Sequence, residues 1–111
     1  MKTIRNGKVA VLYSPGFGAG WYTWNDYHTD GDGSKREFLL FGDEYLISLI
    51  EAGHMNHALN YAKSVLGEDF YYGGFEDIAI EWLDVGTRFI ITEYDGSESI
   101  QTENATAWET A

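Results

Sequence analysis

Apolar stretches alternate along the chain with short segments that are rich in glycine and acidic residues. The first apolar stretch, Lys8 to Ser14, contains β-branched and aromatic residues and predicts a central β-strand that ends at Pro15. A second apolar run, Glu37 to Phe41, predicts a strand that pairs with the first. The turn-rich segment between them, residues 25–34, predicts a loop or a hairpin tip.

Two amphipathic helices are predicted in the middle of the chain. Asp43 is a typical N-cap for a helix that runs to Ala52 and stops at a glycine. A second helix is predicted over residues 56–66, with Gly67 as its C-terminal stop. Apolar residues recur at helical spacing in both segments, and the short link between them predicts a packed helical pair.

The C-terminal part of the chain predicts three antiparallel strands. In residues 78–83 the apolar side chains alternate, which places Ile78, Ile80 and Trp82 on one face. Residues 88–94 and 97–102 are joined by Asp95-Gly96, a strong hairpin signal. We therefore expect these three segments to form an antiparallel meander.

Together these elements predict an α+β fold. An antiparallel sheet, made of the two N-terminal strands and the C-terminal three-stranded meander, is expected to pack against the two central helices. The length of 111 residues predicts one domain. We expect residues 1–103 to form it and residues 104–111 to be a polar C-terminal tail, with Trp108 as the tail's one candidate anchor.

Negative charge is concentrated in the last two-fifths of the chain. Residues 1–67 contain seven acids and six bases, whereas residues 68–111 contain eleven acids and one base. Such a field repels nucleic acid and anionic membranes and attracts basic partners. An acidic surface that keeps the protein soluble and prevents aggregation at sheet edges is the alternative interpretation.

Composition excludes several kinds of site. The chain has no cysteine, so disulfides, thiolate metal sites and thiol nucleophiles are excluded. The polar segment at residues 1–8 does not resemble a signal peptide, and no apolar run is long enough to span a membrane. We expect a cytoplasmic protein without a cofactor. The three histidines lack the spacing of a metal site, and no nucleophile motif is present, so enzyme activity is not expected.

One loop combines backbone freedom with large flat side chains. Residues 14–25 contain the only proline, three glycines and four aromatic residues that are candidates for contact with a ligand or a partner: Phe17, Trp21, Tyr22 and Trp24. The glycine spacing does not match a dinucleotide fingerprint, and no lysine follows as in a phosphate-binding loop. A small-ligand pocket or lid built from this loop is the alternative function, and burial of individual rings is the structural alternative.

Three segments carry a resemblance to known sequences. Residues 8–21 (Lys-Val-Ala-Val-Leu-Tyr-Ser-Pro-Gly-Phe-Gly-Ala-Gly-Trp), 37–41 (Glu-Phe-Leu-Leu-Phe) and 81–100 resemble a group of small uncharacterised proteins from phages, prophages and bacteria. Small acidic phage proteins without cysteine are often inhibitors of host systems, including anti-CRISPR proteins that occupy a basic nucleic-acid site. The resemblance implies such a role by analogy of class and assigns no residue a function.

The predicted function is therefore that of an interaction protein. We expect a stoichiometric, phage-type inhibitor, acting in the host cytoplasm, that binds a basic surface of a nucleic-acid-handling protein, with no direct contact to nucleic acid or membrane. A homo-oligomer is possible. The acids predicted to face outward and to bind the partner are Glu76, Asp77, Glu81, Asp84, Glu93, Asp95 and Glu98.

Overall fold

The computed structural model describes residues 2–29, 31–102 and 109–111. Its first sheet contains three antiparallel strands in the order β1-β2-β3: β1 (Ile4–Arg5), β2 (Lys8–Tyr13) and β3 (Ala79–Asp84). The pairing of β2 with β3 runs from Lys8 opposite Asp84 to Tyr13 opposite Ala79. The prediction that the first apolar stretch forms a central strand is confirmed.

The second sheet is formed almost entirely by the C-terminal part of the chain. It has the order β5-β4-β6 and consists of β4 (Arg88–Tyr94), β5 (Ser97–Gln101) and β6 (Glu109–Thr110). The turn between β4 and β5 contains Asp95-Gly96, as predicted, and both residues have a positive φ. Asparagine, aspartate and glycine adopt this conformation more readily than other residues, which explains the hairpin signal.

Three α-helices and two short 3-10 helices complete the described part of the chain: η1 (Asp26–Thr29), α1 (Gly33–Phe41), α2 (Glu44–Glu51), α3 (Met55–Leu66) and η2 (Phe75–Asp77). The α+β class is confirmed, and so are both predicted central helices. Asp43 caps α2 by accepting a hydrogen bond from the Leu46 N–H at 2.8 Å, and Gly67 ends α3.

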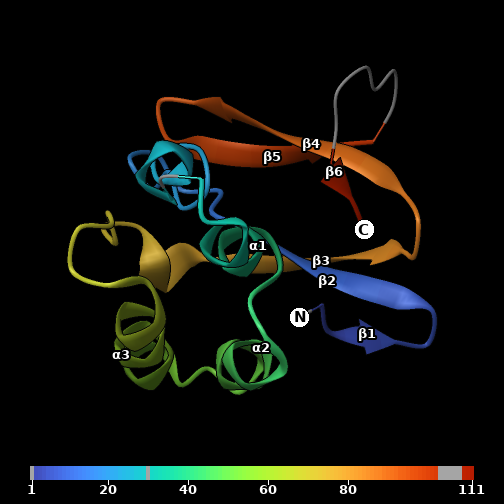
Figure 1. The fold of residues 1–111 in the computed structure, drawn as a ribbon, viewed down its shortest axis with the longest axis horizontal. Coiled ribbons are helices and arrows are strands. Elements are labelled where there is room, and N and C mark those ends of the chain that lie inside the picture. The colour runs from blue at the N-terminus through green and yellow to red at the C-terminus, as the bar shows by residue number, and fades with distance from the viewer. Residues whose placement is uncertain (1, 30, 103–108) are drawn as a thin grey trace.

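The β1-β2-β3 sheet lies between the pair α2 and α3 and the second sheet, and α1 lies beside it and contributes to both cores (Figure 1). Ala10 and Leu12 of β2 pack with the helices in one core, while Val9 and Val11 pack with Phe89 and the second sheet in another. All four of these β2 side chains are fully buried. Because both faces of β2 are covered, its sequence reads as a continuous apolar run.

Residues 37–41 are helical, so the prediction of a strand there is wrong. The side chain of Asp32 accepts hydrogen bonds from the backbone N–H groups of Ser34 and Lys35 and starts α1, which Gly42 ends. Phe38 and Leu39 pack in the helical core, and the next two residues pack in the core of the second sheet. The last turn of α1, residues 38–41, is buried all round and therefore has the same apolar run as a buried strand, which explains the error.

The predicted C-terminal meander is also wrong, although its three strands exist. β3 pairs with β2 and not with β4. In the turn that follows β3, the N–H of Val85 donates to the Gly7 carbonyl and the N–H of Gly86 donates to the Ala111 carbonyl. These bonds direct the chain away from β3 and into the second sheet.

The end of the chain differs from the predicted polar tail. Glu109 and Thr110 form β6 and pair with Phe89 and Arg88 of β4. Ala111 is buried in the core of the second sheet. Residues 109–111 therefore belong to the packed domain, while Trp108, the predicted anchor, lies outside the described residues.

No helix in the described part of the chain has the length and apolar character that crossing a membrane requires.

Candidate protein-interaction site

The loop that follows β2 is held in place by a buried carboxylate from β5. Glu98 is only 2% exposed, and its carboxylate accepts three hydrogen bonds from backbone N–H groups: Ser14 at 3.0 Å, and Tyr22 and Thr23 at 2.8 Å each. The hydroxyl groups of Ser14 and Thr23 donate to it as well. Among the described residues Glu98 has five donors and no cationic partner, which makes it a structural anchor between β5 and the loop.

The prediction that Glu98 faces outward is therefore wrong. Ile100 packs in the core of the second sheet, and Glu98 lies two residues before it on the same face of β5. Strand alternation alone places Glu98 inward. We predicted a surface position for Glu98 because it is a glutamate, and a charged side chain is rarely buried without partners.

Two further loop residues are structural. Trp21 is 1% exposed, and its indole N–H donates to the Leu39 carbonyl at 2.7 Å. The buried amide of Asn25 bridges the loop to the segment after α3, since its Nδ2 donates to the Tyr71 carbonyl and its Oδ1 accepts from the Tyr71 N–H. Trp21 therefore cannot be a contact residue, which corrects that part of the predicted set.

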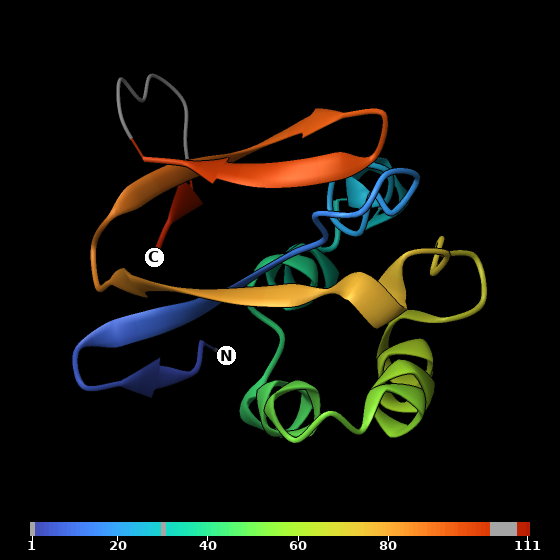
Figure 2. The same ribbon diagram turned by 180° about the vertical axis from the view of Figure 1, so that it is seen from behind.

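The loop lies directly against the turn of the β4–β5 hairpin. The N–H of Gly18 donates to the Asp95 carbonyl at 2.7 Å, and the N–H of Gly20 donates to the Gly96 carbonyl at 2.8 Å. A Cβ on Gly96 would come within 2.8 Å of the backbone of Gly18 and Ala19, so this contact requires glycine. Figure 2 shows the loop (blue), the hairpin turn (orange) and η2 (yellow) at the same end of the molecule.

An exposed pair of aromatic rings lies where the loop meets the hairpin. Phe17 is 72% exposed and Tyr94 is 78% exposed, yet the two rings contact each other edge to face with centroids 6.3 Å apart. Two large rings that remain in water beside one another form an apolar contact surface on a base fixed by Glu98.

Four exposed carboxylates belong to the segments next to this pair. Glu93 and Asp95 flank Tyr94 in the chain. Asp77 lies beside the loop: a Cβ added to Gly16 would be 3.0 Å from the Oδ2 atom of Asp77. Glu76 precedes Asp77 in η2. With other described residues, none of the four forms an ion pair. We call the six residues the aromatic–acidic tip: Phe17, Glu76, Asp77, Glu93, Tyr94 and Asp95.

The remaining predicted acids lie elsewhere. Glu81 is exposed midway along β3. Asp84 is at the opposite end of β3, where its Oδ1 lies 3.0 Å from the ammonium group of Lys8. The structure thus divides the seven predicted acids into four at the tip, one along an edge, one at the far end and one in the interior.

Of the predicted aromatic contacts, Tyr22 and Trp24 are partly buried. Trp24 packs against Tyr71 with ring centroids 5.2 Å apart and covers Gly20 so closely that a Cβ there would lie 2.3 Å from the indole. Tyr22 lies under the guanidinium of Arg36, 5.7 Å from the ring centroid. Only Phe17 of the predicted loop contacts projects freely into solvent.

Arg36 ties this region to the C-terminal strand. Its guanidinium forms ion pairs with Asp26 of η1, at 3.2 Å, and with Glu109 of β6. The hydrogen bonds with Glu109 raise the pKa of Arg36 above its ordinary value. Burial, followed by the nearby charge of Asp26, raises the pKa of Tyr22 to about 12.

The ionisation of tyrosine provides a test of this packing. Burial also raises the pKa of Tyr72 to about 12, and the hydrogen bond from Tyr61 to Asp43 raises the pKa of Tyr61 to about 12. The pKa values of Tyr22, Tyr61 and Tyr72 all exceed the ordinary tyrosine value of about 10, so we expect these three side chains to ionise in a late phase near pH 12. Tyrosinate absorbance followed during alkaline titration measures this late phase.

The sign of the effect on stability follows from the raised pKa values. Since the folded state holds these protons more tightly, their contribution to stability is complete below about pH 10 and is lost as the pH rises toward about 12. Replacing Tyr72 with phenylalanine should remove one ionising tyrosine from the late phase and leave the rest of the titration unchanged. A single phase near pH 10 in the native protein would contradict this packing.

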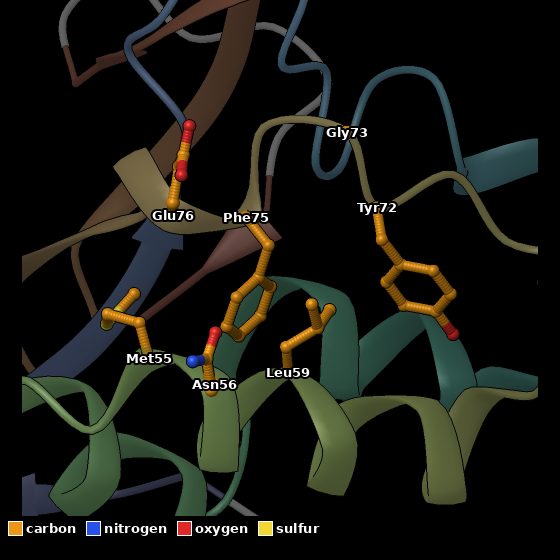
Figure 3. Close-up of a pocket in the computed structure, with 7 residues that line it drawn as sticks. All are labelled: Met55, Asn56, Leu59, Tyr72, Gly73, Phe75 and Glu76. Carbon is orange, nitrogen blue, oxygen red and sulfur yellow. The ribbon is translucent and has the colours of Figure 1, made fainter.

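A cavity of about 230 Å³ lies between the first turns of α3 and η2 (Figure 3). Phe75 points toward Asn56 and Leu59, whereas the carboxylate of Glu76 points away from α3. A second cavity, of about 430 Å³, lies beside α1 and β6 and includes Lys2 and Arg36. Neither cavity is lined by residues 14–25, so neither supports the alternative of a ligand pocket in this loop, which stays a prediction.

The histidines do not form a metal site among the described residues, where no three histidine or carboxylate side chains lie close enough together to hold a metal ion. His57 contacts the Tyr45 hydroxyl at 3.0 Å on the surface of the helical pair. His54 occupies the N-cap position of α3 but makes no side-chain capping bond.

Comparison with protein families, with curated protein sequences and with solved structures finds no match to this chain. The resemblance to phage proteins therefore stays a prediction, and the candidate function rests on the geometry and charge of the aromatic–acidic tip.

Proposed function

We propose that this protein is a small acidic interaction protein that binds a basic surface of another protein through its aromatic–acidic tip. The observation that carries the proposal is the exposed pair of Phe17 and Tyr94, with four exposed carboxylates in the adjoining segments that have no ion-pair partners among the described residues. Exposed aromatic rings are common energetic anchors of protein interfaces, and charged residues around them supply specificity and fast association.

The distribution of charge along the strands supports this choice of surface. Tyr13 and Ala79 mark the end of the β2–β3 pair near the tip, and Lys8 and Asp84 mark the other end, roughly 17 Å away for six extended residues. The cation Lys8 already has Asp84 as its partner at that far end. The four carboxylates of the tip remain available to an external cation.

The chemistry of the tip favours a protein partner over a nucleic acid. Proteins that stack nucleotide bases on aromatic rings surround them with positive charge, because the phosphates must be neutralised. Here the charged side chains in the segments next to the rings are carboxylates, which repel phosphates and attract lysine and arginine, and these cations also bind over aromatic faces.

A basic protein surface that normally holds nucleic acid is the partner that such a tip fits best. We propose that the protein occupies such a surface in the cytoplasm and excludes the nucleic acid, which would make it a stoichiometric inhibitor of the phage-encoded kind. The support for this narrower role is charge complementarity and the predicted resemblance. Displacement of nucleic acid from the partner, with one inhibitor bound per site, is the result that the proposal expects.

Removing both tip rings is expected to abolish specific capture of the partner without unfolding the protein. The double variant Phe17→Ala and Tyr94→Ala deletes two anchors, each of which contributes about 2 kcal/mol or more at a typical interface, so binding should weaken by at least about 100-fold. The measurement is affinity capture from the native host, followed by titration of the purified partner.

A matched control removes exposed apolar groups from the other end of the strands. The double variant Ile4→Ala and Val85→Ala should bind like the native protein, since both residues are exposed and distant from the tip. Equal capture by both double variants would contradict the proposal.

A second comparison separates charge from shape. The variant Glu93→Gln and Asp95→Asn removes two charges while keeping the hydrogen bond to the Gly96 N–H and a residue that tolerates the positive φ at position 95. Association should become slower and less dependent on salt. The variant Asp84→Asn, which removes a charge at the far end, should have little effect.

A further inference from the structure

The outer edge of β3 presents backbone hydrogen-bonding groups that have no strand beside them. β3 is the last strand of its sheet and pairs only with β2 among the described strands. The N–H of Val85 donates to the carbonyl of Gly7, the residue opposite it in register. In an antiparallel pair the bonded residues alternate, so the backbone groups of Ile80 and Trp82 point away from β2.

These groups are free within the described chain, where no hydrogen bond to the backbone of Ile80 or Trp82 joins them to another segment. Figure 2 shows β3 in front of β2 with no segment drawn over it. The edge is also firmly held, because Ile80 and Trp82 pack their side chains against the helical core. Arg5, which is bound to Glu51, lies 5.3 Å from the Trp82 ring centroid.

The charges along this edge select what can be added to it. Glu76 and Asp77 lie immediately before β3, and Glu81 is exposed in its middle; none of them has an ion-pair partner among the described residues. A second copy of the chain would bring the same acids to the edge, and like charges on adjacent strands repel. An added strand that carries lysine or arginine gains attraction instead.

We propose that the free edge of β3 binds an extended basic segment of the partner as an additional β-strand. The backbone groups of Ile80 and Trp82 supply the hydrogen bonds, and Glu81 and Asp77 supply the preference for cationic side chains. This inference rests on the proposed function, because it specifies the form in which a basic partner binds. Since Asp77 also belongs to the aromatic–acidic tip, the edge and the tip form one continuous surface.

A short synthetic peptide of alternating lysine and valine is the probe for this site. With the full-length protein, we expect the peptide to slow amide hydrogen exchange at Ile80 and Trp82 by at least about tenfold. The amides of Glu81 and Leu83, which already point toward β2, should change little. The same peptide with glutamate in place of lysine should not bind.

Backbone methylation of the peptide distinguishes strand addition from simple charge attraction. A lysine–valine peptide with an N-methyl group at every residue keeps its charge but has no backbone N–H on either edge, and its methyl groups keep its carbonyls from approaching β3, so it should lose the protection of Ile80 and Trp82. Equal binding of the methylated and unmethylated peptides would overturn the proposal. The absence of any binding by the lysine peptide would overturn it as well.

The variant Glu81→Lys provides a second test. The Glu81 side chain is exposed and has no ion-pair partner among the described residues, so the fold should be retained. It should bind the lysine peptide at least about tenfold more weakly and accept the glutamate peptide instead. If the exchange protection of the Ile80 and Trp82 amides increased with protein concentration in the absence of peptide, a second copy of the chain would occupy the edge. This result would overturn the proposal that a basic segment of the partner binds there.

Failure of this inference and failure of the proposed function give different results. If the purified partner binds, and the Phe17→Ala and Tyr94→Ala variant does not bind it, the proposed function holds. If Ile80 and Trp82 then remain unprotected in that complex, the strand addition is wrong. If the tip variant binds normally, the proposed function fails whatever the peptide does.

Discussion

Replacing Glu98 with alanine is expected to lower the free energy of unfolding by about 3–5 kcal/mol, because it leaves several buried or partly buried donors without an acceptor. Three backbone N–H groups and two hydroxyl groups now bond to this one carboxylate. The loss should appear as a lower midpoint of urea unfolding with little change in the slope of the transition.

Two further variants test whether the lost hydrogen bonds cause this destabilisation. Glu98→Gln keeps the size of the side chain but turns an amide NH₂ group toward the donors, so it should still lower the free energy of unfolding by about 1–3 kcal/mol. Glu81→Ala removes an exposed glutamate and should change stability by less than about 0.5 kcal/mol. If Glu98→Ala unfolded at the same urea concentration as the native protein, Glu98 would not be the anchor of the loop.

Replacing Trp21 with alanine is expected to lower the free energy of unfolding by about 3–5 kcal/mol, the usual cost of removing a large buried ring. Trp21 is fully packed between the loop and the helices, and Phe75 contacts its ring edge to face with centroids 5.4 Å apart. The measurement is again urea unfolding, followed by circular dichroism so that the loss of an indole does not alter the signal.

Trp21→Phe isolates the polar part of this effect. It retains most of the apolar contact but leaves the Leu39 carbonyl without the indole donor, so a cost of about 1–3 kcal/mol is expected. Phe17→Ala, in the same loop, removes a ring that is mostly in water and should have almost no effect on stability. A large loss of stability in Phe17→Ala, or none in Trp21→Ala, would reverse these assignments.

The two residues show why the loop could not be divided into structural and contact residues from its sequence. Phe17 and Trp21 are both aromatic, lie four residues apart and are surrounded by the same glycines. Their environments differ because the β4–β5 turn, almost 80 positions later in the chain, packs against the backbone at Gly18 and Gly20. Only the residues on one side of that contact remain exposed.

The acidic set illustrates the same point for charge. The concentration of acids after residue 67 is a property of the sequence, and four of the predicted acids, Glu76, Asp77, Glu93 and Asp95, are exposed in the structure. The sequence did not reveal that β3 and β4 belong to different sheets. Because β3 pairs with β2, Asp84 lies beside Lys8 at the end of β3 that is distant from the tip, and Glu81 lies on the edge strand of its sheet.

Several predictions succeeded because the interactions behind them are local. The N-cap at Asp43, the stop at Gly67 and the Asp95-Gly96 turn depend on bonds or backbone angles within a few residues, so the α+β class and the central helices followed from the sequence. Strand partners and the burial of Glu98 depend on groups far apart in the chain. The helix at residues 33–41 has local caps at Asp32 and Gly42, but its apolar run is equally compatible with a buried strand. Several partners compete for the same apolar run, and only the packed tertiary structure decides among them.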